Sequence, residues 1–337
     1  MAANVRSSNF ELLRIILICF IVTYHFFVIV YVQGTGETDS LLKALWLPLH
    51  IAVICFVLIS GYFHIRPSLG GAIKLLLPVI FYYSIPCLLA YICGLKGIEG
   101  NIGNYLFFLS KSPYWFIRTY FYLFLFSPII NKWLDCSTLK GKKYFLVILF
   151  FIGIYEALMG DLSVSNGKNV VLFMFLYVLG DMLREKQSFL DKLPILPLII
   201  CWFVFNAILV LGWLLFKESS LGDVIWRISF PYSSPVLIFN AVWLFVILSK
   251  VRFQSRAVNY VARSVFAVYI LTESDLIKPL LLKPVLVYIY EMSTNYYLLI
   301  LGVVLFSLVV TVVCIIIDKI FQPLFSSIQQ SVEKIAI

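Results

Sequence analysis

An arginine and a histidine inside the first apolar segment are the residues whose types and spacing best suit chemistry. Arg14 and His25 are separated by ten residues within the run from Phe10 to Val32. At about 100° per residue, the eleven steps between them end about 20° past three full turns, so both side chains share one helix face. At ~1.5 Å per residue they lie roughly 16 Å apart along the axis. Ionisable residues inside a membrane span are costly to bury, so the pair indicates a reaction site or a pathway.

His25 is the candidate catalytic residue of this pair. It lies roughly 22 Å beyond the inner boundary of the segment, and therefore nearer the outer face. Neutral imidazole can act as a general base near physiological pH. His50 and His64 lie in the outer half and at the inner end of the second apolar segment, where an interface histidine is the simpler interpretation.

The elements that must position these residues are membrane-spanning helices. Of the 337 residues, 62% are hydrophobic and 13% are charged, whereas soluble domains have about 25% charge. Mean hydropathy is +1.00, which is typical of a polytopic membrane protein. We expect an all-α transmembrane bundle of about ten spans. They cover residues 10–32, 42–63, 71–94, 113–131, 143–160, 169–184, 194–216, 231–249, 262–290 and 296–318.

The ninth span is the one we expect to be broken or partly re-entrant. It contains Glu273, Asp275, Lys278 and two prolines, and such backbone is tolerated at membrane depth only where it is buried in protein or lines a cavity.

The charge distribution predicts that both termini are cytoplasmic. With ten spans, sixteen of the 26 Lys and Arg residues fall on the predicted cytoplasmic side and six on the other. The net charge of +9 therefore reflects topology and attraction to anionic lipid headgroups. Nucleic-acid binding is not expected, because no soluble basic surface is available.

Further polar residues follow the second span and open the fourth. Ser60, Gly61 and Tyr62 end the second span, and Arg66 and Lys74 follow beside a glycine pair. Two cations next to a helix start suit an anionic, phosphate-bearing ligand, although taken alone they fit ordinary positive-inside charge better.

The fourth span begins near Trp115, which fits an aromatic belt. Arg118 lies about one turn further in and needs a buried partner. A structural ion pair and a substrate contact are equally compatible with Arg118; its candidate anions are Glu156, Asp161 and Glu273.

The remaining features predict a single integral-membrane domain over residues 1–337. The seven cysteines lie mostly inside spans without C-x-x-C or Cys/His metal spacing, so we expect neither a disulfide framework nor a metal site. The first apolar run has no small-residue cleavage site and reads as an uncleaved span.

Several segments together resemble the integral-membrane acyltransferase-3 family, and the resemblance covers essentially the whole chain. Its most specific element is the Arg14–His25 pair combined with the S-G-Y that ends at Tyr62. The other segments are N-F-E-L-L-R ending at Arg14, Y-W-F-I-R-T-Y ending at Tyr120, S-P-I-I-N ending at Asn131, Y-V-L-G-D-M-L-R ending at Arg184 and S-V-F-A-V-Y-I-L ending at Leu271.

The resemblance implies transfer of an acyl group, commonly acetyl from acetyl-CoA, to a sugar hydroxyl at or beyond the outer face of a bacterial plasma membrane. Acyl-CoA would be a co-substrate, with no permanently bound cofactor. His25 matches the catalytic histidine and Arg14 its partner arginine. Ser60, Tyr62 and Trp115 match further landmarks of the family.

Two departures from the family pattern concern the ninth span and the loop after the second. The family often has a histidine where this chain has Thr272, followed by Glu273, which could supply the polar role instead. The usual arginine-rich run after the second span is reduced to Arg66 and Lys74.

Our hypothesis is that Arg14, Arg66 and Lys74 hold an anionic acyl-CoA donor, while His25 activates the hydroxyl of a glycan or lipid-linked sugar. Direct transfer and transfer through an acyl-histidine are both compatible with these residues. A membrane transporter or flippase of a glycan precursor is the main alternative, and a glycan polymerase is another. Against them, no internal repeat is evident and the outer loops are short. Oligomeric state is not readable from the sequence, because lipid-facing and partner-facing surfaces look alike.

Overall fold

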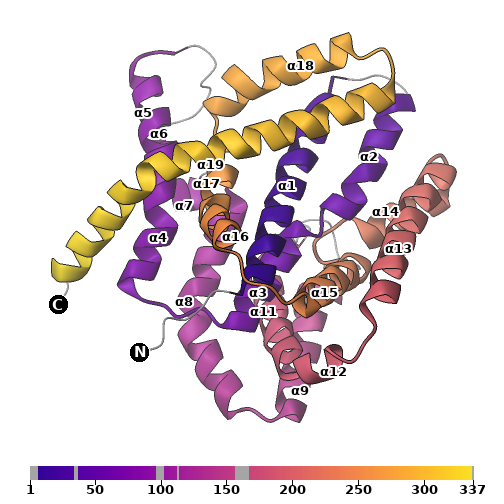
Figure 1. Cartoon of the computed structure of the whole chain (residues 1–337), viewed down its shortest axis with the longest axis vertical. Helices are drawn as coiled ribbons and strands as arrows, with labels where there is room; N and C mark the ends of the chain where they lie inside the picture. The colour runs from indigo at the N-terminus through magenta and orange to yellow at the C-terminus, as the bar shows by residue number, and fades with distance from the viewer. Residues whose placement is uncertain (1–6, 34–36, 96–101, 112–113, 156–166, 336–337) are drawn as a thin grey trace.

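The computed structural model of the chain describes residues 7–33, 37–95, 102–111, 114–155 and 167–335. Every regular element in these ranges is a helix (Figure 1). A helix satisfies its backbone hydrogen bonds internally, which is the requirement inside a bilayer. Within the described residues, five helical stretches are long and apolar enough to cross a membrane: Ser8–Tyr31, Ser40–Phe63, Leu69–Ile92, Ile195–Phe216 and Tyr296–Lys334. The chain is a helical membrane protein.

Each of the ten predicted spans coincides with one helix or with successive helices. In chain order these are α1 (Ser8–Tyr31), α2 with α3 (Glu37–Leu49, Ala52–Phe63), α4 with α5 (Leu69–Val79, Ile85–Ile92), α8 (Trp115–Cys136), α9 (Leu139–Phe150), α11 (Val170–Glu185), α13 (Ile195–Phe216), α15 (Pro235–Lys250), α17 with α18 (Val265–Thr272, Lys283–Met292) and α19 (Tyr296–Ile335). Several are shorter or less apolar than a full span, so the count of ten and the side of the termini stay predictions. Residues 113 and 156–160 of two predicted spans lie outside the described residues.

Short helices connect these elements. They are α6 (Ile102–Leu106), α7 (Phe108–Lys111), α12 (Gln187–Leu190), α14 (Ser220–Ser229), α16 (Arg256–Val261) and the 3₁₀ turn η4 (Ala262–Ser264). Among the described residues, the π-helical turn η1 (Ile80–Ser84) joins α4 to α5, η2 (Phe151–Tyr155) follows α9, and η5 (Lys278–Leu282) opens α18. Pro86 follows η1 and Pro284 follows η5; proline has no backbone N–H, so a locally wider turn is the expected adjustment.

The ninth predicted span is broken, as the sequence predicts. α17 ends at Thr272, and helical structure resumes only with η5 and α18. Figure 1 shows α18 lying side by side with the first half of α19 at the top of the view, turned away from the direction of α17. The break leaves Glu273 and Asp275 in a short non-helical stretch packed within the protein.

The apolar core consists of two large clusters with α1 between them. Leu13 and Leu17 belong to the cluster formed mainly by α3, α8, α11 and α15. Ile18, Val22 and Phe26 belong to the cluster formed mainly by α17, α18, α19 and the η1 region. One helix therefore faces both halves of the molecule, and its polar residues lie where the halves meet.

Two glycines bring α3 and α11 into close backbone contact. A Cβ on Gly61 would lie 2.0 Å from the Tyr177 carbonyl oxygen, and a Cβ on Gly180 would lie 2.3 Å from the Leu58 carbonyl oxygen. Small residues at a membrane-helix interface permit this approach.

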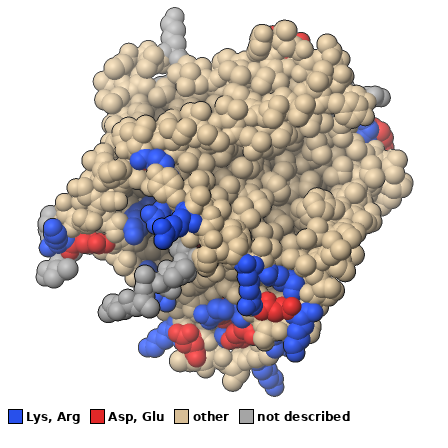
Figure 2. Space-filling model, viewed as in Figure 1, with Lys and Arg blue, Asp and Glu red and all other residues tan. Residues whose placement is uncertain are grey.

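Cations gather at one end of the molecule. Figure 2, drawn in the view of Figure 1, shows Lys and Arg concentrated on the lower half of the visible face, while the upper half is mostly uncharged. In Figure 1, α1 begins in this lower half and runs upward, and α19 ends in the same half. Arg14 therefore lies toward the charge-rich end and His25 toward the charge-poor end.

Candidate active site

A single cavity connects the two polar residues of α1. It has a volume of about 520 Å³, and both Arg14 and His25 line it, as their spacing predicts. Because they lie roughly 16 Å apart along the helix, the cavity extends at least that far through the bundle. Its wall is built from α1, α3, α4, α8 and α17, together with the segment that carries Tyr232.

The deep end of the cavity is lined by His25, and a carboxylate–lysine pair lies behind it. Nδ1 of His25 lies 2.7 Å from Oε1 of Glu273, and Oε2 of Glu273 accepts a hydrogen bond from Lys278 Nζ at 2.8 Å. His25 and Glu273 retain 24% and 16% of their side-chain exposure. Although they are close, the two facing atoms do not have the angular geometry of a hydrogen bond. A carboxylate at Nδ1 selects the tautomer that leaves Nε2 free to accept a proton.

A second histidine completes the deep end. His50 is 6% exposed, lines the cavity, and stacks between Phe230 and Tyr232 with ring centroids 4.3 and 4.1 Å away. Tyr24 packs edge-on against it. His50 is therefore buried in the wall of the cavity that His25 also lines, and its position at a membrane interface stays a prediction.

The other end of the cavity is lined by cations. Arg14, Lys74 and Arg263 come from α1, α4 and η4, and all three line it. Arg14 contacts Glu11 at 2.5 Å. Lys74 and Arg263 have exposed side chains and no ion pair or hydrogen bond within the described part of the chain. Cations from three separate elements at one opening can bind an anion, such as a phosphate group.

Comparison with known proteins identifies the family of the chain. A family model described as an acyltransferase domain matches residues 7–319, nearly the whole chain. The chain belongs to the acyltransferase-3 family. No curated protein and no solved structure matches it. The protein is thus a membrane acyltransferase, and the transporter and polymerase alternatives are set aside.

Ser60 and Trp115 of this acyltransferase line the middle of the cavity. Ser60 Oγ donates to the Phe56 carbonyl at 2.9 Å and lies 3.1 Å from the Tyr120 hydroxyl, which lines the same wall. Trp115 packs against Tyr232 with ring centroids 5.1 Å apart.

Four other predicted site residues do not line the cavity: Arg66, Tyr62, Arg118 and Glu273. Arg66 is exposed on the connection between α3 and α4. The Tyr62 hydroxyl donates to Gln187 Oε1 at 3.3 Å, and its ring packs on Phe10. Arg118 lies on α8. Glu156 and Asp161, two candidate partners of Arg118, lie outside the described residues. The third, Glu273, contacts His25 and Lys278 instead.

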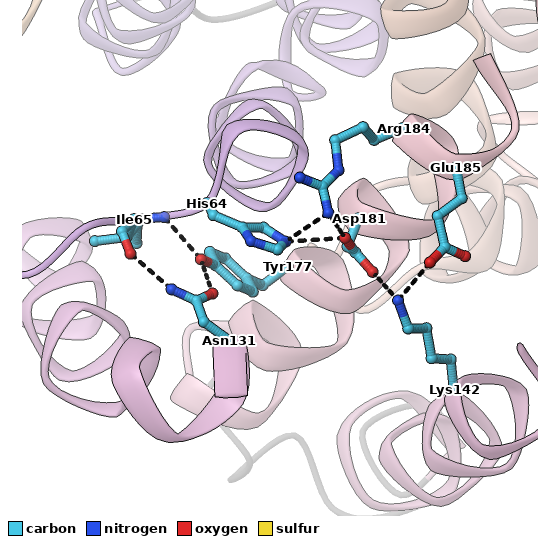
Figure 3. A network of polar contacts seen from close by, with 8 residues as sticks. All are labelled: His64, Ile65, Asn131, Lys142, Tyr177, Asp181, Arg184 and Glu185. Atoms are coloured by element: carbon cyan, nitrogen blue, oxygen red, sulfur yellow. Dashed lines mark hydrogen bonds and ion pairs between the residues drawn. The ribbon is translucent and has the colours of Figure 1, made fainter. Parts of the chain in front are cut away.

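Sequence reasoning missed two residues that line the acyltransferase cavity and one that lies behind its wall. Arg263 looked like one more cytoplasmic cation, and His64 looked like an interface residue, yet both line the cavity. Asp181 fell inside the family landmark Y-V-L-G-D-M-L-R without a role, and it contacts His64 (Figure 3). A buried aspartate inside an apolar span is itself a signal of function, and it could have identified Asp181.

Proposed function

We propose that this acyltransferase moves an acyl group, in the first instance acetyl, from a cytoplasmic acyl-CoA to a hydroxyl of a cell-surface or lipid-linked glycan. The observation that carries the proposal is one cavity with three cations at one end and a histidine–carboxylate pair at the other. An acyl-CoA has this polarity: its phosphates are anionic, and its thioester lies at the end of a long neutral arm.

The orientation follows from the charge distribution. The cation-rich half would face the cytoplasm, in a bacterial plasma membrane, which places the cavity opening at Arg14, Lys74 and Arg263 within reach of cytoplasmic acyl-CoA. His25 would then lie toward the outer face, where a glycan hydroxyl is available. The agreement between the charge bias of the loops and the lower half of Figure 2 supports this orientation.

His25 would act as the general base. Its Nε2 takes the hydroxyl proton while the acceptor oxygen attacks the thioester carbonyl, forming a tetrahedral intermediate. Collapse of the intermediate breaks the carbon–sulfur bond, and the imidazolium returns the proton to the departing thiolate. Products are the glycan ester and free CoA. Glu273 would stabilise the imidazolium through Nδ1, and Lys278 would keep Glu273 ionised and oriented.

The test compares the surface and lipid-linked glycans of cells by mass spectrometry. The strains carry the wild type, a deletion, His25→Ala, and the control Asn206→Ala, all at equal expression. Asn206 is buried on α13, pairs with Asn240, and does not line the cavity. We expect a fixed mass increment with the wild type and the control only. Identical glycans in all four strains would overturn the glycan acceptor, and an increment retained in His25→Ala would overturn the role of His25.

A further inference from the structure

A buried carboxylate network lies directly behind the cation-lined end of the cavity. Asp181 on α11 is fully buried and accepts hydrogen bonds from Lys142 Nζ at 2.6 Å and from Arg184 at 2.5 Å. Its Oδ1 lies 2.9 Å from Nε2 of His64 (Figure 3). Lys142 is itself 3% exposed and also donates to Glu185 at 2.6 Å. Two cations and two carboxylates balance, so the network holds His64 without adding net charge.

A second set of contacts fixes the residue after His64. The hydroxyl of Tyr177 accepts from the Ile65 backbone N–H at 2.7 Å and donates to Asn131 Oδ1 at 2.7 Å. The Asn131 amide donates in turn to the Ile65 carbonyl at 2.8 Å. Both backbone polar groups of Ile65 are therefore bound by side chains of α8 and α11, as Figure 3 shows.

The backbone at His64 is strained. Its φ is 59° with ψ 127°, a conformation that disfavours residues with a Cβ. Such strain costs about 1–3 kcal/mol and persists only where the surroundings enforce it, commonly at functional sites. Here the surrounding contacts are those of Asp181 and Arg184 with the His64 ring and those of Tyr177 and Asn131 with the Ile65 backbone.

The clamped residues belong to the cavity wall. His64 and Ile65 both line the cavity, and the chain continues from them into α4, which contributes Gly71 and Lys74 to the same end. Gly61 and Gly180 already lock α3 against α11 one turn away. The network therefore fixes His64 and Ile65, where the chain leaves the packed helices α3 and α11. From this point the chain forms the rim of the cavity.

We propose that Asp181 is a positioning residue for the acyl donor. Asp181 acts through His64, while Tyr177 and Asn131 act on the backbone of Ile65. Together these contacts hold the connection between α3 and α4 in the conformation that shapes the cation-lined rim of the cavity. This inference rests on the proposed function, because the rim is where the donor's anionic end would bind. Asp181 does not line the cavity and does not touch the donor. Its loss should weaken donor binding while leaving His25 and Glu273 in place.

The test measures binding of CoA itself to the purified full chain in lipid nanodiscs, by calorimetry, together with the melting temperature. Because Asp181→Asn alone leaves buried Lys142 short of one partner, the first variant is the double change Asp181→Asn/Lys142→Met, which removes both charges together. The second is Tyr177→Phe, which removes only the hydroxyl at Ile65. Asn206→Ala is the control, because it also removes a buried polar contact but lies away from the cavity.

We expect both variants to raise the dissociation constant of CoA roughly tenfold, equal to about 1.4 kcal/mol, because small misplacements of a binding rim are costly. The control should lose thermal stability without a change in CoA affinity. Wild-type affinity in both variants, with lowered melting temperatures, would reduce the network to a structural role and overturn the inference. Absence of CoA binding by the wild type would instead refute the proposed donor.

Discussion

Nδ1 of His25 lies 2.7 Å from Oε1 of Glu273, and this contact joins the first predicted span to the break in the ninth. The neighbouring Thr272 makes no comparable contact: its hydroxyl bonds back to the Val268 carbonyl at 2.9 Å, and it is buried. Glu273, and not Thr272, is therefore the residue of the break in the ninth predicted span that contacts His25.

The contact predicts that Glu273→Gln impairs catalysis more than binding. The amide cannot stabilise an imidazolium as the carboxylate does, so we expect the transfer rate to fall by about 100-fold or more. The affinity for CoA should stay within about twofold, because Glu273 lies at the end of the cavity away from the cations. Glycan mass spectrometry and CoA calorimetry measure the two quantities. Equal losses in both would place Glu273 in donor binding or in folding.

The cation-lined end predicts a role for Arg263 that the sequence did not indicate. Arg263→Gln should weaken CoA binding by roughly 10- to 150-fold, since charge-assisted hydrogen bonds are worth about 1.5–3 kcal/mol. The matched control is Arg256→Gln, an exposed arginine on the adjacent α16 that does not line the cavity. Calorimetry at two salt concentrations should show a smaller salt dependence for Arg263→Gln than for the wild type. Equal affinities for the two variants would argue against an anion site at Arg263.

The positive φ of His64 predicts an unusual order of stability among its variants. His64→Ala loses the contact with Asp181 and keeps the strained backbone. His64→Gly loses the same contact but relieves the strain, so we expect it to be more stable than His64→Ala by about 1 kcal/mol. Thermal unfolding in detergent measures the difference. A more stable alanine variant would mean that the backbone relaxes to a negative φ once the ring is removed.

The close approach of α3 and α11 predicts opposite outcomes at two glycines. In Gly180→Ala the new methyl group would lie 2.3 Å from the Leu58 carbonyl oxygen, so α3 and α11 must move apart. We expect a loss of about 1–3 kcal/mol in stability, as in other overpacked sites. Gly212→Ala on α13 meets nothing within 4 Å and should be neutral or slightly stabilising. Similar melting temperatures for the two variants would contradict the close packing.

The residue sequence by itself determined the helical membrane class, the family, the shared face of Arg14 and His25, and the break in the ninth span. Each follows from local physics. Apolar runs of about 20 residues must form helices in lipid, the helical period sets which residues share a face, and charged residues with prolines cannot continue a lipid-facing helix.

Only the tertiary structure decided which residues meet across helices. It placed Glu273 beside His25, brought Arg263 rather than Arg66 to the cavity, buried His50 in its wall, and clamped His64 with Asp181. These pairings depend on how each helix is rotated and on which helices pack against it. Because the helices are apolar on every side, the sequence does not indicate which face meets which neighbour. A lipid-facing leucine and a protein-facing leucine are the same in a sequence, so the partners of a polar side chain become fixed only when the helices assemble.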